Sequence, residues 1–542
     1  MKLLLLNPPI RDFYDTEIRL QPLGLAMIKA AVRKYVPQVE VIIKDYHHGH
    51  GRRTVPIPSA LAYVKEFYSV PDQSPFSTFH QFYHFGAAYE DLARDVETLQ
   101  PDLIGISSLF TPYYQEVLSC ARAIKARWPA PIIIGGHHAS AAPESLLTDP
   151  AVDFVIRGEG ERPLVEFLQA HLTARPLDQV PNLGFKHQAR MILNPLAENY
   201  PLNDLPMADF SDWPVSRYNQ AGKPIAMIAA SRGCPHGCSF CSIHQTFGRR
   251  YRRRAPDLVV AEVEERYRQG YRLVDFEDDN LTWDQGHFRT ILNGISQLSR
   301  PEGLILTAMN GVSYLGLENE TLLLMKKAGF THLNLSLVSS RGRTLDRVER
   351  PHTVAEFEAV VRQARALDFN LVAYQILGLP QENLIAMIET MALLARLPVL
   401  IGASIFYLTP GCPLNEAYPD LGSEEMVRAR STAMAIETPS CRRDDLATLF
   451  ITARILNFLK GLPVHGPDTD LSSALTLARG LGRRQVSGVE IMEKLFSEGR
   501  LYAKTGQGMV RRSWFKTALF FEILSRAEVL ATSAGGSLKL TH

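Results

Sequence analysis

The chain has 542 residues, 46% hydrophobic and 21% charged. This composition is typical of globular protein and excludes a largely disordered chain. Its length exceeds that of one ordinary domain, so we expect two to four packed units. Lys and Arg number 58 against 57 Asp and Glu, and the net charge of +1 gives no overall field that would favour nucleic acid or an anionic membrane. No apolar run reaches the roughly 18 to 20 residues that span a bilayer. We therefore expect a cytoplasmic protein, with association at a membrane surface left open.

The first 170 residues alternate short apolar runs with amphipathic stretches. Candidate strands rich in Val, Ile and Leu lie at residues 2–7, 40–45, 102–107, 131–134 and 154–157. Helical patterns separate most of them, at 23–35, 89–99, 112–127 and 142–147. Continuous apolar strands that alternate with helices predict a parallel sheet covered on both faces, a doubly wound Rossmann-like α/β unit. Ligands of such sheets bind at the carboxyl ends of the strands.

Residues 46–85 form a connection far longer than the few residues that usually join such elements. The segment is rich in aromatic and histidine residues. It is either a lid over the carboxyl edge of the sheet or an ordered excursion that packs its own aromatic side chains. The sequence leaves both interpretations open.

The rest of the chain divides into three parts. Residues 171–221 hold six prolines and little periodicity, which predicts a linker. Alternation resumes over residues 222–422, where candidate strands, each followed by a turn or helix, lie at 225–231, 273–277, 304–309, 332–337, 370–377 and 403–408. Six strands predict a partial (β/α)6 TIM-type barrel with its chemistry at the carboxyl ends of the strands. Helical patterns dominate residues 423–542, which predicts a helical C-terminal cap or substrate domain.

Three of the six cysteines, Cys234, Cys238 and Cys241, crowd into eight residues just after the first barrel strand. Three thiols on one short loop can ligate one metal centre, and thiolates favour zinc or an iron–sulfur cluster. Four cysteines normally fill a 4Fe-4S cluster, so three leave one iron open to an outside ligand. A zinc site completed by His236 or His244 is the alternative.

The spacing Cys-x3-Cys-x2-Cys, with Phe240 before the last cysteine, resembles the radical S-adenosylmethionine (SAM) enzymes over about residues 222–415. The resemblance implies that the three cysteines are the catalytic ligands of a 4Fe-4S cluster whose open iron binds SAM. In that family, reductive cleavage of SAM gives a 5'-deoxyadenosyl radical that takes hydrogen from the substrate. The resemblance also implies an external one-electron reductant of the flavodoxin or ferredoxin type.

Further positions fit the SAM site of that family. The resemblance assigns to it the aromatic residue of the cysteine loop and residues at the ends of the second, fourth and fifth barrel strands: Phe240, Glu277, Asp278, Ser336, Gln375, Leu377 and Gly378. The sequence around Val338 departs from the commoner Gly-x-Gln-Ser pattern, which leaves the role of Ser336 open. Ordinary polarity at strand ends is the alternative interpretation for each position.

A basic run occupies residues 249–254, where five of the six residues are Arg. The interpretations, in order of preference, are a solvated loop, contact with the cofactors, and RNA binding through neutralised phosphates. The methylthiotransferases that modify transfer RNA share the barrel but carry three further cysteines in the N-terminal domain. Here that domain offers only Cys120, so we expect no second cluster and no nucleic-acid partner.

The first 170 residues resemble the cobalamin-binding domain that precedes many radical SAM barrels, through segments 7–9, 22–25, 101–107, 135–139 and 157–161. The resemblance assigns cobalamin contacts to residues that follow the third, fourth and fifth strands: Ser107, Ser108, Phe110, Thr111, Gly135, Gly136, His137, His138, Gly158 and Glu159. No Asp-x-His-x-x-Gly sequence occurs, which implies cobalamin without a histidine ligand on cobalt. The Gly-x-Gly-x-x-Gly turn expected for flavin or a dinucleotide does not follow the first strand.

The combined resemblance implies a class B radical SAM methyltransferase. Such an enzyme moves a methyl group from methylcobalamin to an unactivated carbon of a small molecule, lipid, tetrapyrrole, natural product or peptide. The alternatives are a cyclase, ring-contracting or oxidising enzyme with the same cofactors, and a cobalamin-responsive regulatory protein with a relic barrel. Cys412 is either a radical or acid–base group or a buried bystander, and we expect Cys120 and Cys441 to be structural.

Overall fold

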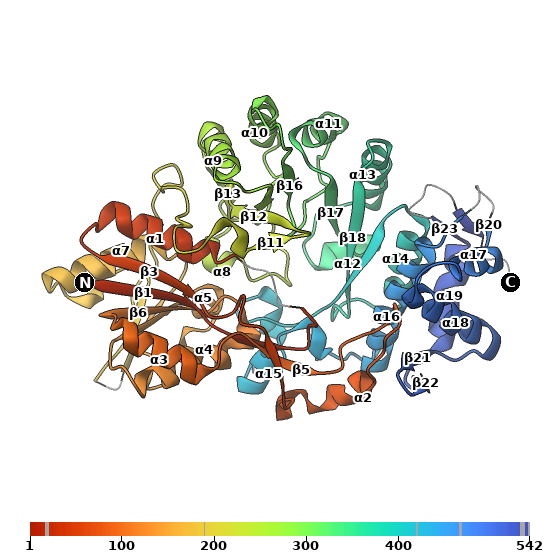
Figure 1. Ribbon diagram of the computed structural model, residues 1–542, viewed down its shortest axis with the longest axis horizontal. Coiled ribbons are helices and arrows are strands. Elements are labelled where there is room, and N and C mark those ends of the chain that lie inside the picture. The colour runs from red at the N-terminus through yellow and green to blue at the C-terminus, as the bar shows by residue number, and fades with distance from the viewer. Residues whose placement is uncertain (17–20, 189, 419–420, 465–468, 532–536, 540–542) are drawn as a thin grey trace.

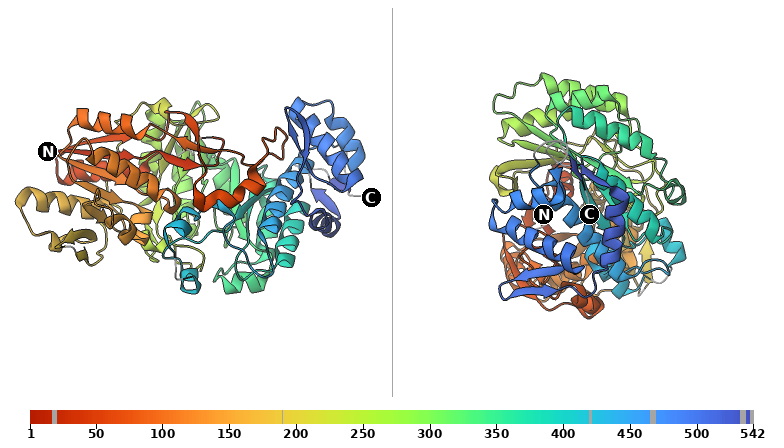
Figure 2. Two further views of the ribbon diagram at one scale, coloured as in Figure 1. Left: turned by 90° about the horizontal axis from the view of Figure 1, so that it is seen from below. Right: turned by 90° about the vertical axis from the view of Figure 1, so that its right-hand side faces the viewer.

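The computed structural model of the protein (Figure 1) describes residues 1–16, 21–188, 190–418, 421–464, 469–531 and 537–539. It has three units: an N-terminal sheet domain at one end of the long axis, a C-terminal unit at the other end, and a barrel between them (Figures 1 and 2). Within the described ranges, no helix is both long enough and apolar enough to cross a membrane.

The sheet domain has seven strands in the order β10-β9-β8-β7-β6-β1-β3. Five are parallel, namely β1 (Lys2–Asn7), β3 (Glu40–Asp45), β6 (Leu103–Ser107), β7 (Ile132–Gly135) and β8 (Phe154–Ile156). Helices α1 (Leu23–Tyr35) and α7 (Glu161–Thr173) cover one face, and α3 (Tyr89–Leu99) and α4 (Tyr114–Lys125) cover the other (Figure 1). This arrangement confirms the predicted doubly wound α/β unit, because apolar strands buried on both faces need helices on both sides.

Part of the segment expected to be a linker belongs to this sheet. Strands β9 (Leu183–His187) and β10 (Arg190–Leu193) form an antiparallel hairpin that pairs with β8. Leu183 and Phe185 are buried in the same apolar core as helix α7. The prolines of 171–221 therefore flank a short ordered hairpin, and the chain crosses to the barrel only after it.

The aromatic insert is ordered and links two units. Its strands β4 (Arg52–Val55) and β5 (Phe82–Phe85) form an antiparallel sheet with β2 (Ile10–Asp12). Between them, the short helices η1 (Ser59–Val64) and α2 (Lys65–Tyr68) lead toward the C-terminal unit (Figure 2). The ring centroids of Phe76 and Phe458 lie 5.2 Å apart, and Arg512 forms a buried ion pair of 2.6 Å with Asp72. The insert is ordered and packs its aromatic side chains, as one of the two interpretations predicted. Part of this packing is against the C-terminal unit.

The barrel has the six predicted parallel strands. They are β12 (Lys223–Ile228), β15 (Leu273–Phe276), β16 (Ile305–Thr307), β17 (His332–Val338), β18 (Asn370–Leu377) and β19 (Leu400–Ile405). Parallel bridges join the two groups of three between β16 and β17. The outer helices are α9 (Pro256–Arg268), α10 (Gln285–Gln297), α11 (Asn319–Ala328), α13 (Val354–Ala366) and α14 (Leu384–Arg396). The first four form the arc at the top of Figure 1, and α14 lies beside the C-terminal unit.

The C-terminal unit is mainly helical. Helix α16 (Arg443–Lys460) packs on the last barrel strand, where the Asn457 amide bonds both backbone groups of Ile401 at 2.8 and 2.9 Å. Helices α17 (Leu471–Ala478), α18 (Arg483–Glu498) and α19 (Thr517–Ala527) follow. The prediction for this region was a helical cap, yet a hairpin of β21 (Tyr502–Thr505) with β22 (Gly508–Arg511) and a small sheet of β20 (Thr469–Asp470), β23 (Val529–Ala531) and β24 (Ser537–Lys539) complete the unit.

Candidate functional site between the two sheets

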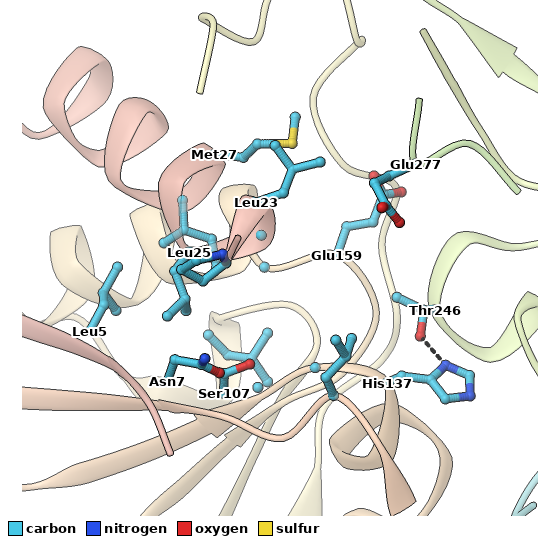
Figure 3. A pocket seen from close by; sticks show the side chains of 18 of the residues that line it. Leu5, Asn7, Leu23, Leu25, Met27, Ser107, His137, Glu159, Thr246 and Glu277 are labelled. Atoms are coloured by element: carbon cyan, nitrogen blue, oxygen red, sulfur yellow. Dashed lines mark hydrogen bonds between the residues drawn. The ribbon is translucent and has the colours of Figure 1, made fainter. Parts of the chain in front are cut away.

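A cavity of about 470 Å³ lies where the carboxyl ends of the two sets of strands meet (Figure 3). Asn7 and Ser107 reach it from the ends of β1 and β6, and Glu277 reaches it from the end of β15. Both architectures bind ligands at the carboxyl ends of their strands. The fold therefore brings two binding edges to one cavity.

The walls of the cavity on the sheet side fit a bulky ligand with an apolar face. Leu23, Leu25 and Met27 of helix α1 line it (Figure 3). Gly24 and Gly135 also line it, and a Cβ atom on either glycine would meet no protein atom closer than 3.9 Å. Since protein packing does not require glycine at these two positions, their bare backbone leaves space for a ligand. A corrin macrocycle fits a cavity of this kind.

Seven of the residues assigned to cobalamin line this cavity: Ser107, Phe110, Gly135, Gly136, His137, Gly158 and Glu159. Gly136 has φ +122°, and a Cβ there would lie 2.6 Å from the Ser108 carbonyl oxygen, so the turn itself requires glycine. Three of the expected residues do not line the cavity, namely Ser108, Thr111 and His138.

His138 is a structural residue in this fold. Its side chain is fully buried, with Nδ1 3.2 Å from the Thr111 hydroxyl and Nε2 3.0 Å from the Ser145 hydroxyl. Burial lowers the pKa of His138 to about 3, so the ring is neutral. The side chains of His138 and Thr111 bond each other and do not line this cavity, so their contact with cobalamin stays a prediction.

His137 points across the cavity to the loop that carries the cysteines. Its Nδ1 lies 2.8 Å from the Thr246 hydroxyl and its Nε2 lies 2.9 Å from the Ser242 hydroxyl (Figure 3). Burial lowers the pKa of His137 to about 4. Both ring nitrogens are engaged by hydroxyls, so His137 joins the sheet domain to the cysteine loop.

A buried ion network makes a second connection. Arg232, in the strand just before the cysteine loop, pairs with Glu161 at 2.6 Å and with Glu159. Glu159 also pairs with Arg252, and the Asn199 amide bonds Glu161 at 2.8 Å. Burial alone would lower the pKa of Arg232, but the carboxylates of Glu161 and Glu159 raise it above its usual range. The glycine-rich turn after β8 thus anchors the strand that leads into the cysteines.

The cysteine loop runs between β13 (Ser231–Arg232) and helix α8 (His244–Phe247). Hydrogen-bond donors approach two of its thiols: Asn280 Nδ2 lies 3.6 Å from Cys234 Sγ, and Arg350 Nη1 lies 4.0 Å from Cys238 Sγ. Burial raises the pKa of the Cys241 thiol to about 11, so a bound cationic centre is needed to hold it as a thiolate. Three thiols on one loop fit a 4Fe-4S cluster with one open iron.

In the part of the chain that the structure describes, no three His, Cys, Asp or Glu side chains are gathered to hold one metal ion as placed, and this includes the three cysteines themselves. The placement of the ligands therefore does not choose between the cluster and a zinc site completed by His236 or His244. The ring of His236 lies against Trp283 and His352, at centroid distances of 5.1 and 5.4 Å.

The three acidic residues that follow β15, residues 277–279, point to two different sides. Glu277 and Asp279 line the cavity, and they accept hydrogen bonds of 2.7 Å from Asn310 Nδ2 and the Gly233 amide. Asp278 turns the other way and accepts from the Ala230 amide at 3.0 Å and from the Ser231 hydroxyl. Burial raises the pKa of Asp278 to about 7. Asp278 thus holds the start of the cysteine loop in place, and its role in the SAM site stays a prediction, while Asp279 lines the cavity beside Glu277.

Two of the residues expected on the fifth strand also face away. Gln375 is fully buried and donates to the Met387 carbonyl of helix α14 at 2.9 Å, and Leu377 is fully buried on the same side. A strand alternates its side chains between two faces, so Ile376 packs with Phe240 at the mouth of the barrel instead. Gly378 follows with φ +82° and lies against Leu446 of helix α16.

Ser336 and Arg350 complete the interior near the cysteines. Arg350 Nη2 donates to the Ser336 carbonyl at 2.7 Å while Nη1 approaches Cys238. The guanidinium of Arg350 therefore places a permanent positive charge beside the cysteine loop. The sequence did not indicate Arg350, because no local motif marks it. Asp279 and Asn280, in contrast, directly follow the predicted residues Glu277 and Asp278.

The basic run of residues 249–254 is largely paired within the chain. Arg252 pairs with Glu159, Arg253 with Asp284, and Arg254 with Glu262. The side chains of Arg249 and Arg250 are exposed. Its charges therefore serve mainly internal contacts, the Arg252 pair being part of the network beneath the cavity.

Family comparisons agree with this geometry. The model of the B12 binding domain matches residues 77–168, and that of the Radical SAM superfamily matches residues 228–394. The chain is 25% identical to an uncharacterized methyltransferase from Pyrococcus horikoshii, covering 54% of this chain and 64% of the relative. It is 25% identical to the cytidylyl-2-hydroxyethylphosphonate methyltransferase of Streptomyces wedmorensis, covering 70% of this chain and 73% of the relative.

A third relative has a different activity in its name. The chain is 28% identical to the anaerobic magnesium-protoporphyrin IX monomethyl ester cyclase of Cereibacter sphaeroides, covering 57% of this chain and 52% of the relative. Over these three relatives, the chain thus spans between about half and three quarters of their lengths.

Among solved structures, the radical SAM methyltransferase TsrM from Kitasatospora setae, with cobalamin and a [4Fe-4S] cluster bound, has the same fold. Its TM-score is 0.58 at 18% identity, covering 76% of this chain and 73% of that chain. The predicted order of a cobalamin-binding sheet followed by a radical SAM barrel is confirmed. The chain therefore carries a B12 binding domain, matched over residues 77–168, followed by a Radical SAM domain, matched over residues 228–394.

Proposed function

We propose that this protein is a cobalamin-dependent radical SAM methyltransferase that transfers a methyl group to an unactivated carbon. The observation that supports it most is the cavity shared by the two sheets, with the cobalamin-type glycine edge on one wall and the carboxylates next to the cysteine loop on the other. When bound, the cluster with SAM supplies a radical that abstracts hydrogen and cobalamin supplies a methyl group.

Residues on both sides of the cavity would hold the cluster, SAM and cobalamin. Cys234, Cys238 and Cys241 would ligate the cluster, with Arg350 and Asn280 donating to their sulfur atoms. Glu277 and Asp279 present carboxylates to the cavity, where they suit the amino group of SAM or the polar edge of cobalamin. Phe240 packs against an apolar cluster that includes Val338 at the end of β17, and Gly24 and Gly135 leave the space for the macrocycle.

Three half-exposed side chains offer a surface for the substrate. Tyr407, directly after β19, is 36% exposed although burial raises its pKa, and the charges of Cys241 and Asp12 act on it. Leu109 and Phe110 of the sheet domain, which line the cavity, are 47% and 42% exposed. Half-exposed aromatic and aliphatic side chains inside a cleft suit a substrate with an apolar surface.

A cyclase or oxidising enzyme with the same cofactors is the second candidate. The magnesium-protoporphyrin cyclase relative favours it, and the positioning residues would act in the same way for either outcome. The methyltransferase ranks first because the relative that covers most of this chain carries that activity in its name.

The proposal includes an external reductant of the flavodoxin or ferredoxin type and a small-molecule substrate in the cytoplasm. The exposed Arg249 donates to the His236 carbonyl at 3.3 Å, so the cysteine loop lies close to the surface, where a reductant can approach it. All six cysteines are free thiols, as expected for a reducing compartment.

The test feeds cells deuterated methionine, with and without the gene, and compares their metabolites by mass. The proposal predicts a metabolite that carries an intact trideuteromethyl group only when the gene is present. A Cys238→Ala version of the gene must abolish it, whereas Cys441→Ala, which changes a buried cysteine of the C-terminal unit, serves as the matched control. A gene-dependent metabolite without the label would favour the cyclase or oxidase.

A further inference from the structure

The side chain of Asn280 reaches the cysteine loop from the end of β15. Asn280 directly follows the three acidic residues after that strand, and its Nδ2 lies 3.6 Å from Cys234 Sγ, a hydrogen-bond distance for a sulfur acceptor. The residue is 5% exposed. Its amide therefore lies in the protein interior, beside the first of the three cluster cysteines.

We propose that Asn280 is a positioning residue that raises the reduction potential of the cluster by donating a hydrogen bond to the Cys234 thiolate. The inference rests on the proposed function, because it gives Asn280 a role toward the cluster that starts the reaction. Hydrogen bonds to the sulfur atoms are among the features that set the potential of an iron–sulfur cluster. A donor stabilises the reduced cluster more than the oxidised one, because reduction adds negative charge.

The first support is the way in which the residues after β15 hold the chain that enters the cysteine loop. Asp278 accepts a backbone hydrogen bond of 3.0 Å from the residue just before β13. Asp279 accepts one of 2.7 Å from the Gly233 amide. Asn280 comes next and reaches Cys234, the residue after Gly233. Three successive side chains thus bond the entering chain in order, which fixes the amide of Asn280 at the sulfur atom.

The second support is that the Asn280 amide has no other hydrogen bond in the part of the chain that the structure describes. Its Nδ2 bonds only the sulfur there, and its Oδ1 is buried without a partner. A buried amide of this kind is costly compared with an apolar side chain of the same size. Because a thiolate accepts hydrogen bonds and an amide oxygen cannot donate one, Nδ2 is the atom that faces the sulfur. The contact with Cys234 is therefore what an amide supplies here and a leucine would not.

The third support comes from the donors at the other two thiols. Cys238 has the cationic Arg350 at 4.0 Å, and Arg350 also bonds a backbone carbonyl of β17 at 2.7 Å. At Cys241, burial raises the pKa of the thiol and a backbone hydrogen bond from Ile243 opposes this rise. Asn280 is thus a neutral side-chain donor, and its replacement by an apolar residue removes one hydrogen bond without a change of net charge.

The test is a redox titration of the full-length enzyme, reconstituted with cluster and cobalamin and followed by low-temperature EPR of the reduced cluster. Asn280→Leu removes the donor at similar size, and Asn280→Asp removes it and adds a negative charge. At a fixed solution potential, we expect the ratio of reduced to oxidised cluster to fall about threefold in Asn280→Leu. In Asn280→Asp we expect a fall of about tenfold or more, tenfold being about 59 mV for one electron.

The matched controls are Asn293→Leu and Asn293→Asp, at an exposed position of α10, which must leave the ratio unchanged. Iron and sulfide content show whether each variant holds a full cluster. Asn280→Ser, whose side chain is shorter, replaces Asn280→Leu if that variant does not. A full cluster with an unchanged potential in Asn280→Leu would overturn the inference, as would loss of the cluster from all three Asn280 variants, which would show a purely structural role.

The titration needs no substrate, so its failure and the failure of the proposed function are distinguishable. A lowered potential in Asn280→Leu, in an enzyme that transfers no methyl group, contradicts only the proposed activity. Methyl transfer by an enzyme whose cluster potential does not respond to Asn280→Leu contradicts only the role of Asn280.

Discussion

The Nδ1 atom of His137 lies 2.8 Å from the hydroxyl of Thr246, so helix α5 (His137–Ala141) of the sheet domain directly bonds helix α8, which follows the cysteine loop. Together with the pair between Arg232 and Glu161, this contact fixes the distance between the two cofactor edges. Methyl transfer between two cofactors requires such a fixed arrangement, because small displacements of reacting groups slow a reaction strongly.

Breaking the buried network must destabilise the protein. Arg232→Met leaves Glu159 and Glu161 buried without their main cation, and we expect the free energy of unfolding to fall by about 3 to 5 kcal/mol. The exposed pair of Arg253 with Asp284 is the matched control, and Arg253→Met must cost less than about 1 kcal/mol. Urea unfolding of both variants checks the difference, and equal losses would contradict the structural role of the network.

Filling the glycine cradle must reduce cobalamin binding without loss of fold. A valine at position 135 projects into the cavity, where no protein atom lies within 3.9 Å of the new Cβ. We expect Gly135→Val to weaken cobalamin binding by at least about tenfold, measured as cobalt content and visible absorbance after dialysis. Gly342→Val, on the surface far from the cavity, must bind as the wild type does. Undiminished binding by Gly135→Val would place cobalamin elsewhere.

The buried His138 predicts an acid sensitivity with a definite sign. Its pKa falls from the usual 6.5 to about 3 on folding, so below pH 6.5 the unfolded chain binds a proton that the folded chain does not. Its contribution to stability is complete above pH 6.5 and is lost as the pH falls. His138→Gln must therefore lose about 2 kcal/mol less than wild type between pH 7 and pH 5.

Urea unfolding at the two pH values measures this difference, with His187→Gln on an exposed strand position as the control. His138→Gln must also keep its bound cobalamin, because the ring lies beneath the sheet edge and not in the cavity. Loss of cobalamin from this variant alone would identify His138 as a contact residue.

Because the cysteine loop and the sheet side of the cavity hold different cofactors, we expect the cluster to be lost without loss of cobalamin. Cys238→Ala must lose iron and sulfide yet retain cobalamin, since the sheet side of the cavity stays intact. Cys412→Ala must retain both, because its thiol bonds Asn415 at 3.4 Å and is buried in an apolar cluster with residues that follow β19. Elemental analysis and absorbance of the purified variants check this. A Cys238→Ala protein with full iron content would show that the loop does not ligate the cluster.

The sequence predicted both sheets because long apolar strands and their intervening helices are local patterns. It predicted the cysteine loop because chemistry and spacing coincide there. It could not tell which way the side chains of Gln375 and Asp278 point, since a one-residue change in strand alternation sends a side chain to the opposite face. It could not find Arg350 or the role of Glu161, whose partners Cys238 and Arg232 lie far away in the chain.

The central claim is methyl transfer through the shared cavity. The reconstituted enzyme, reduced and loaded with cobalamin, is incubated with SAM deuterated at the methyl group and with the metabolite found in cells. The account predicts a product that gains an intact trideuteromethyl group together with 5'-deoxyadenosine. Formation of 5'-deoxyadenosine with a converted but unlabelled product would contradict it.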